Sequence, residues 1–295
     1  YRKFGNTNEQ ISLLGLGGFH IGSVPTLDDS VKLTRSAIDQ GITFMDNCWD
    51  YHKGKSEEWM GHALRDGYRN KVFLMSKIDG HTKAAAAKQI DESLQRLQTD
   101  HVDLMQHHEV IRMQDPDKIF SEGGSHEAML EAQKAGKIRH LGFTGHKDPA
   151  IHLHMLDLAQ KNNYPLAAVQ MPLNVLDAHF KSFAHHVLPV LLKRGIAPLG
   201  MKSFAAGGII RNKIATPAEC LHYAMNLPTA TVISGMDTPE ILAQNLAAAR
   251  SFKPLTQDQL AALLAPTRPF ALSGKHEPFK LGKGFDGTLH NPQWL

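Results

Sequence analysis

The stretch VFLM at residues 72–75 is a short apolar run of the kind that forms a buried β-strand. It is followed by a longer segment in which Ile90, Leu94 and Leu97 recur at the spacing of one helix face. A second apolar run, VDLM at residues 102–105, comes next. Strand, helix and strand in this order predict a crossover unit whose two strands are parallel.

The same alternation extends in both directions from this unit and covers most of the 295-residue chain. Runs as apolar as these are typical of parallel strands that are buried on both faces. Eight strand-then-helix units predict a closed (β/α)8 TIM barrel, and because no linker interrupts them, we expect residues 1–295 to form a single domain. The apolar runs lie at residues 13–16, 42–45, 72–75, 102–105, 138–143, 167–170, 196–200 and 230–234.

The two ends of the chain fall outside this repeat. Residues 1–14 have apolar ends around a Gly5-Asn6 pair, which predicts a short β-hairpin that caps the barrel. Residues 265–295 form a C-terminal extension rich in Gly, Pro and His, which we expect to pack over one end of the barrel. The glycines of residues 15–20 lack the G-x-G-x-x-G spacing of a doubly wound dinucleotide-binding fold, so the sequence disfavours that alternative.

Composition and charge exclude several classes of function. The 32 basic and 29 acidic residues are spread along the chain and leave a net charge of +3, so no basic block indicates nucleic acid binding. No apolar run approaches the roughly 20 residues that a membrane span needs. Cys48 and Cys220 match no metal-binding spacing, and we expect no metal in the site. A small molecule is therefore the expected partner.

The two cysteines also bear on the compartment in which the protein works. Two isolated thiols favour a reducing compartment, and we expect the protein to be cytoplasmic. The chain begins at Tyr1 without a methionine, which leaves a removed export signal open. The sequence carries no signal about the oligomeric state.

Reactive groups of a (β/α)8 barrel collect at the carboxyl ends of its strands, and four candidates follow consecutive apolar runs. Asp46 and Tyr51 follow the second run, Lys77 the third and His108 the fourth. An ammonium group near a tyrosine favours the phenolate and lowers the tyrosine pKa, while a carboxylate keeps the ammonium charged. Taken singly, each residue also fits a solvated charge or a loop cap. Together they indicate proton transfer to a carbonyl oxygen, with the histidine either binding that oxygen or relaying a proton.

At these residues the sequence resembles the aldo-keto reductase superfamily, over nearly the whole of residues 1–249. The resemblance rests on GITFMD at residues 41–46 followed by Tyr51, on LMSK at residues 74–77 and on VDLMQHH at residues 102–108. It implies a hydride transfer from a nicotinamide cofactor to an aldehyde, ketone or sugar carbonyl, or the reverse oxidation. Tyr51 would be the proton donor, Asp46 and Lys77 would tune it, and His108 would orient the substrate.

The same resemblance implies most of a cofactor site. Thr144 and Gln170 correspond to the residues that hold the nicotinamide carboxamide. The usual neighbouring asparagine is Gly145 here, so that contact is lost or is taken over by His146. Met201 stands where the family commonly has a tyrosine that stacks on the nicotinamide ring, and a thioether can also pack on an aromatic face.

The remaining cofactor contacts belong to the phosphates and the adenosine. Gly18 and Lys202 are expected beside the cofactor, with Lys202 as a counter-charge next to the glycine-containing stretch 203–208. The loop and helix start that would hold the adenosine end carry no lysine or arginine for the 2′-phosphate of NADP(H). A carboxylate there suits a ribose diol and repels a phosphate, so NAD(H) is favoured. The residues expected at this end are Gly235, Asp237, Gln244 and Asn245.

The substrate itself is not readable from the sequence. We expect Phe19, His20 and Trp49 to line its pocket, together with the connection at residues 110–125 and the C-terminal tail. Two other classes of function stay open. One is a nucleotide-sensing or regulatory subunit on the same barrel, and the other is a metal-dependent barrel enzyme, for which the chain carries no HExxH motif.

Overall fold

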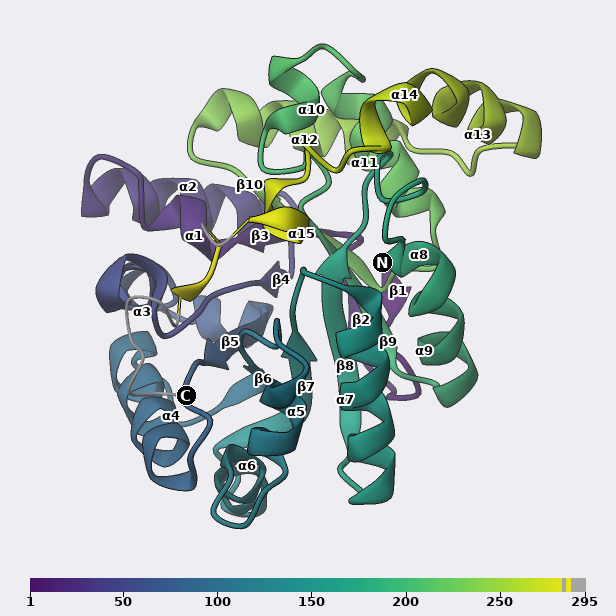
Figure 1. The fold of residues 1–295 in the computed structure, drawn as a ribbon. Helices are drawn as coiled ribbons and strands as arrows, with labels where there is room; N and C mark the ends of the chain where they lie inside the picture. The colour runs from purple at the N-terminus through teal and green to yellow at the C-terminus, as the bar shows by residue number, and fades with distance from the viewer. Residues whose placement is uncertain (283–284, 288–295) are drawn as a thin grey trace.

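A computed structural model describes residues 1–282 and 285–287 of the chain and shows a closed parallel barrel of eight strands ringed by helices (Figure 1). The expected (β/α)8 barrel is confirmed, and the strands follow one another around it in sequence order. Each predicted apolar run lies on one barrel strand. The strands are β3 (Leu14–Gly17), β4 (Phe44–Met45), β5 (Phe73–Ile78), β6 (Val102–His107), β7 (Ile138–Thr144), β8 (Leu166–Pro172), β9 (Ala197–Met201) and β10 (Thr231–Gly235).

The helices pack around the barrel and over its ends. Several begin where a threonine side chain accepts a hydrogen bond from the helix backbone, as Thr26, Thr82 and Thr238 do. The helices are α1 (Gly18–Ile21), α2 (Leu27–Asp39), η1 (Tyr51–Gly54), α3 (Lys55–Ala63), η2 (Tyr68–Lys71), α4 (Lys83–Leu97), α5 (Gln114–Ile119), α6 (Ser125–Lys134), α7 (Pro149–Lys161), α8 (Phe183–His186), α9 (Leu188–Arg194), α10 (Gly208–Arg211), α11 (Pro217–Asn226), α12 (Pro239–Ser251), α13 (Gln257–Leu264), η3 (Ala265–Thr267), α14 (Arg268–Ala271) and α15 (Pro278–Leu281).

The predicted N-terminal hairpin is present as the antiparallel pair β1 (Arg2–Lys3) and β2 (Gln10–Ile11). Phe4 is fully buried and packs against Phe73 with ring centroids 4.7 Å apart. Gly5 has a φ of +55°, and a Cβ there would lie 2.8 Å from the Gly195 carbonyl oxygen, so the turn requires glycine. The hairpin therefore closes the amino-terminal end of the barrel and leaves the carboxyl end for the site.

The strands are more buried and some are longer than their apolar runs suggest. β5 and β6 are buried along their whole length, although the apolar runs end at Met75 and Met105. The extension adds Lys77 to β5 and His107 to β6. Lys77 and His107 can occupy these buried positions because both form hydrogen bonds inside the protein, Lys77 with Asp46 and His107 with Tyr164.

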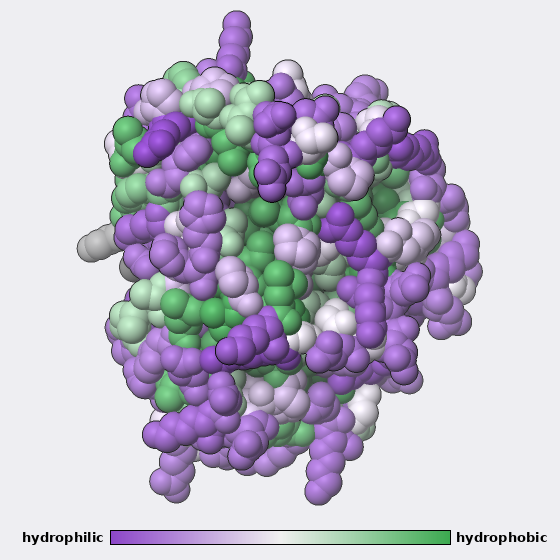
Figure 2. Space-filling view, turned by 90° about the vertical axis from the view of Figure 1, so that its right-hand side faces the viewer, coloured by the Kyte–Doolittle hydropathy of each residue, from purple (hydrophilic) through white to green (hydrophobic). Residues whose placement is uncertain are grey.

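The outer surface is mostly polar. Figure 2 shows a face that hydrophilic side chains largely cover, with hydrophobic side chains gathered toward its middle. Among the described residues, no helix combines the length and the apolar character needed to cross a membrane.

Candidate active site

The loop after β4 is attached to the strands on both sides of it. The Asp46 backbone N–H donates to the Leu16 carbonyl oxygen on β3 at 2.9 Å, and the Trp49 N–H donates to the Lys77 carbonyl oxygen on β5 at 3.0 Å. These bonds fix the loop that connects the end of β4 to the short helix η1, which starts with Tyr51. The loop thereby brings Tyr51 over Lys77.

Lys77 connects the predicted catalytic residues. Its Nζ lies 2.5 Å from Asp46 Oδ1, 2.7 Å from the Asn47 carbonyl oxygen and 3.1 Å from Tyr51 Oη. An ammonium group has three donors and no acceptor, so all three N–H groups are used and the tyrosine oxygen must accept. The phenolic hydrogen of Tyr51 is consequently free to point at a substrate.

The Lys77–Asp46 ion pair is almost fully buried, with 1% and 3% of the two residues exposed. Gly18 also belongs to this group, because its backbone N–H donates to Asp46 Oδ2 at 3.3 Å. A Cβ at Gly18 would lie 2.2 Å from the Asp46 carbonyl oxygen, so no larger residue fits there without moving the loop. Gly18 therefore packs directly on Asp46.

The electrostatics of Tyr51 differ from the sequence-based expectation that Lys77 would lower its pKa. Burial, followed by the negative charge of Asp46, raises the pKa of Tyr51 well above its ordinary value of 10.0. The main reason is that burial disfavours the charged phenolate, and in addition the aspartate that binds Lys77 offsets much of the ammonium charge. Tyr51 therefore holds its proton at neutral pH in the ligand-free protein.

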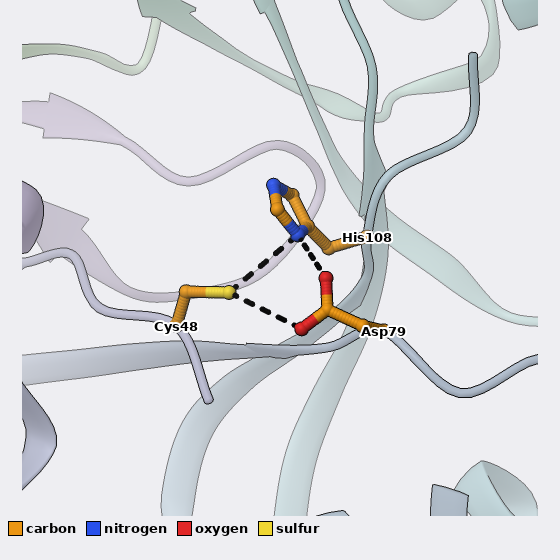
Figure 3. A group of neighbouring side chains, drawn as sticks. All are labelled: Cys48, Asp79 and His108. Atoms are coloured by element: carbon orange, nitrogen blue, oxygen red, sulfur yellow. Dashed lines mark hydrogen bonds and ion pairs between the residues drawn. The ribbon is translucent and has the colours of Figure 1, made fainter. Parts of the chain in front are cut away.

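His108 follows β6 and lies at the other side of Tyr51, with the two rings edge-on and their centroids 6.2 Å apart. Its Nδ1 lies 2.5 Å from Asp79 Oδ1 and 3.5 Å from Cys48 Sγ (Figure 3). The structure thus brings all four predicted catalytic residues together. It also adds Asp79 and Cys48, which the sequence analysis missed although Asp79 stands two residues after Lys77 at a strand end.

The two residues expected to hold a carboxamide are neighbours. Thr144 on β7 and Gln170 on β8 are register partners, and both are about 2% exposed. Within the described part of the chain, the buried Gln170 Oε1 has no hydrogen-bond partner. A buried amide oxygen without a partner costs free energy, so this position fits a ligand that donates an N–H, as a carboxamide does.

The surroundings of Gly145, where the resemblance implies an asparagine, leave no space for a side chain. A Cβ at this position would lie 2.1 Å from the Val110 carbonyl oxygen, so a side chain has no room. The neighbouring His146 is buried, with Nδ1 3.2 Å from Glu109 Oε2 and with Nε2 unpartnered. Nε2 of His146 is therefore the ring nitrogen that has no hydrogen-bond partner among residues 1–282 and 285–287.

Met201 ends β9, and Lys202 follows it in a left-handed backbone conformation with φ of +52°. Lys202 Nζ lies over two aromatic rings of the C-terminal extension, 5.5 Å from the Phe279 centroid and 5.9 Å from the Phe285 centroid. His146 is edge-on to the same two rings. The described part of the extension therefore packs over the carboxyl end of the barrel, as expected.

A buried ion cluster anchors this extension. The Lys280 side chain is fully buried and its Nζ lies 2.8 Å from Asp177 Oδ1 and 3.1 Å from Glu277 Oε2. Glu277 also accepts a hydrogen bond from Asn174 Nδ2 at 2.9 Å. Sequence patterns gave no indication of this cluster, because Asn174 and Asp177 lie about a hundred residues before Glu277 and Lys280.

The residues expected at the adenosine end gather at the end of β10 and the start of α12. Asn245 is fully buried, donates to Ser234 Oγ at 3.0 Å and leaves its Oδ1 without a partner, whereas Gln244 is exposed. Asp237 is partly exposed in the intervening loop. A Cβ at Gly235 would lie 2.2 Å from His20 Nδ1, so His20 lies directly over this glycine.

Phe19, His20 and Trp49, the residues expected to line the substrate pocket, have different surroundings. Phe19 is 51% exposed and edge-on to Tyr51, with centroids 5.5 Å apart. Trp49 donates its indole N–H to Glu92 Oε2 on α4 at 2.8 Å, so its polar end is bound to a barrel helix. Phe19 contacts the proposed proton donor, and His20 lies at Gly235.

A barrel with this four-residue group at its carboxyl end defines a class of reductase-like proteins, and sequence comparison makes the assignment specific. A sequence model of the aldo/keto reductase family matches residues 13–219. The chain belongs to this family.

Two relatives with curated descriptions are similar in sequence to this chain. The chain is 30% identical to aldo-keto reductase YhdN of Bacillus subtilis, in a match that covers 70% of this chain and 62% of that protein. The match thus spans less than two thirds of YhdN. The chain is 26% identical to L-galactose dehydrogenase of Arabidopsis thaliana, over 94% of this chain and 98% of that protein.

Solved structures show the same fold. The chain superposes on aldo-keto reductase AKR11C1 from Bacillus halodurans with a TM-score of 0.75 and 20% identity, covering 90% of this chain and 95% of that one. An aldo-keto reductase from Klebsiella pneumoniae, solved in complex with NADPH, gives a TM-score of 0.72 at 24% identity over 92% and 96% of the two chains.

Proposed function

We propose that the protein is a nicotinamide-dependent oxidoreductase that interconverts a carbonyl compound and its alcohol, with Tyr51 as the proton donor in reduction. The observation that carries the proposal is the hydrogen-bond arrangement at Lys77, which makes the Tyr51 oxygen accept and leaves its hydrogen free. Membership of the aldo/keto reductase family supports the reaction class.

A nicotinamide cofactor fits the residues that are present. Thr144 and the unpartnered Gln170 Oε1 would hold its carboxamide, and Met201 would pack beside its ring. When bound, the cofactor supplies or accepts a hydride. Tyr51 then donates its proton to the oxygen that becomes the alcohol, and His108 holds that oxygen in place. Lys77 stabilises the negative charge that remains on the tyrosine.

The test is steady oxidation of NADH or NADPH with a panel of aldehydes, ketones and aldoses. The name of the relative that matches nearly the whole chain, L-galactose dehydrogenase, is the reason to include sugars and to assay the reverse oxidation. We expect turnover with at least one member of the panel. Cofactor binding without turnover on any of them would instead favour a nucleotide-sensing subunit.

We further propose that the adenosine end prefers NADH, because Asp237 lies between β10 and α12 and residues 235–241 contain no lysine or arginine. Asp237→Lys should raise the affinity for NADPH by about tenfold or more, since a cation replaces a carboxylate beside the 2′-phosphate. Kd values for both cofactors, measured by fluorescence titration, check this expectation.

Glu240→Gln is the matched control, because Glu240 is an exposed carboxylate three residues further along the same segment. It should leave the ratio of the two Kd values unchanged. Both cofactors must be measured, because the Klebsiella pneumoniae structure is a complex with NADPH. Tighter binding of NADPH than of NADH by the unaltered protein would refute the preference.

A further inference from the structure

We propose that Asp79 is a positioning residue for His108: the two share one proton at Nδ1, so that His108 Nε2 keeps a hydrogen for the substrate carbonyl oxygen. The inference rests on the proposed function, because it assumes that a carbonyl binds beside Tyr51. It adds a residue to the site that neither the motifs nor the four-residue group includes.

The geometry brings Asp79 and His108 into direct contact. The Asp79 Oδ1 to His108 Nδ1 distance is 2.5 Å, which is short for a hydrogen bond between a nitrogen and an oxygen. Figure 3 shows the other ring nitrogen of His108 pointing away from both Asp79 and Cys48. One nitrogen is thus occupied inside the protein, and the other is directed elsewhere.

Asp79 is held rigidly enough to fix the ring. Its side chain is 2% exposed, and its backbone N–H donates to Oε1 of the buried Gln89 on α4 at 2.8 Å. The next backbone N–H, of Gly80, donates to the same oxygen at 2.9 Å. This double contact fixes the backbone that carries the carboxyl group.

The protonation states follow from burial. Burial raises the pKa of Asp79 to about 8, and burial lowers the pKa of His108 to about 4. At neutral pH the Asp79 carboxyl group therefore carries a proton and donates it to His108 Nδ1. A neutral imidazole that accepts at Nδ1 must carry its hydrogen on Nε2, where it can donate to a carbonyl oxygen.

Loss of the shared proton reverses this arrangement. An ionised Asp79 accepts a hydrogen bond from His108 Nδ1–H, and the neutral ring then has a bare Nε2. A bare nitrogen cannot donate to a carbonyl oxygen. The pair therefore favours carbonyl reduction below about pH 8 and opposes it above.

A metal ion is the rival explanation, because Cys48 Sγ, the Asp79 carboxylate and His108 Nδ1 all lie within 4.8 Å of one another. Nitrogen and oxygen ligands on one tetrahedral zinc lie roughly 3.3 Å apart. The observed 2.5 Å is a hydrogen-bond distance instead. Burial also raises the pKa of Cys48 well above its ordinary value, which favours the thiol over the thiolate that metals bind.

Other ionisable groups surround the pair and affect both members. The carboxylate of Glu109 favours a charged His108, and the ammonium groups of Lys77 and Lys202 oppose it. Lys77 also favours an ionised Asp79. The groups that face the pair are Cys48, Asp50, Tyr51, Lys77, His81, Glu109, His146 and Lys202.

The first test is the pH dependence of kcat/KM for carbonyl reduction. We expect the unaltered protein to lose activity about tenfold per pH unit above about pH 8. Tyr51 does not explain such a fall, because its pKa is raised well above 10.0. In Asp79→Asn the amide donates an N–H to Nδ1 at every pH, so the fall should disappear or move up by at least one pH unit.

Asp79→Ala removes the partner altogether and should lower kcat/KM about 10- to 100-fold at pH 7 without changing the cofactor Kd. Cys48→Ala is the matched control, because it removes a neighbour of the same ring nitrogen and should keep the alkaline fall. An identical alkaline fall in the unaltered protein and in Asp79→Asn would overturn the proposal. So would a stoichiometric metal ion that is lost in Cys48→Ala.

The second test needs no activity and no stable variant. Nitrogen-15 NMR of His108 in the resting protein at pH 7 should show a protonated Nε2, and a bare Nε2 would overturn the inference. A protonated Nε2 combined with no turnover of any carbonyl would leave the pair intact and contradict the proposed function instead.

Discussion

Tyr51→Phe is expected to reduce turnover by about 10²- to 10⁴-fold while leaving the cofactor Kd within twofold of the unaltered value. The substitution removes one oxygen atom, and that oxygen carries the proton which the carbonyl needs. It leaves the ring, which is edge-on to Phe19 and to His108, in place. Stopped-flow measurement of cofactor oxidation, together with a fluorescence titration of binding, separates the two effects.

Tyr68→Phe provides a matched control. Its hydroxyl group donates to Asp39 Oδ2 at 2.8 Å on the exposed surface, far from the carboxyl end of the strands. Loss of this bond should leave turnover unchanged. If Tyr51→Phe retained more than a tenth of the activity, another residue would have to be the proton donor, and His108 would be the first to examine.

Much of the barrel could be predicted because its signals are local. The apolar runs mark each strand. Even β4, which has only two residues, pairs with both neighbouring strands. The strand-end rule then places Asp46, Lys77 and His108 at one end of the barrel whatever the loop details are. The same rule selected Tyr51, which lies five residues beyond Asp46, but its place at the start of η1 depends on the loop that precedes it.

The parts that could not be predicted depend on contacts between distant segments. Gly145 is required by a carbonyl oxygen of Val110, and the C-terminal extension is anchored through Lys280 to Asp177. No local pattern encodes either contact. The prediction that Lys77 lowers the pKa of Tyr51 was wrong for a related reason. Burial by the surrounding structure raises this pKa and outweighs the effect of the one cation that the motif supplies.

Lys77→Met is expected to abolish most turnover and to lower the free energy of unfolding by about 3–5 kcal/mol. The substitution leaves Asp46 buried without its cation and leaves Tyr51 without the group that stabilises a phenolate. Its loss of activity should match or exceed that of Tyr51→Phe. Chemical denaturation followed by circular dichroism measures the stability, and the cofactor assay measures the turnover.

The double variant Asp46→Asn with Lys77→Met separates stability from chemistry. Removing both charges leaves no uncompensated ion in the buried pair, so most of the lost stability should return. Turnover should not return, because the ammonium group beside Tyr51 is still missing. Recovery of both quantities would show that Lys77 only neutralises Asp46. Recovery of stability alone would identify Lys77 as the group that lets the tyrosine release its proton.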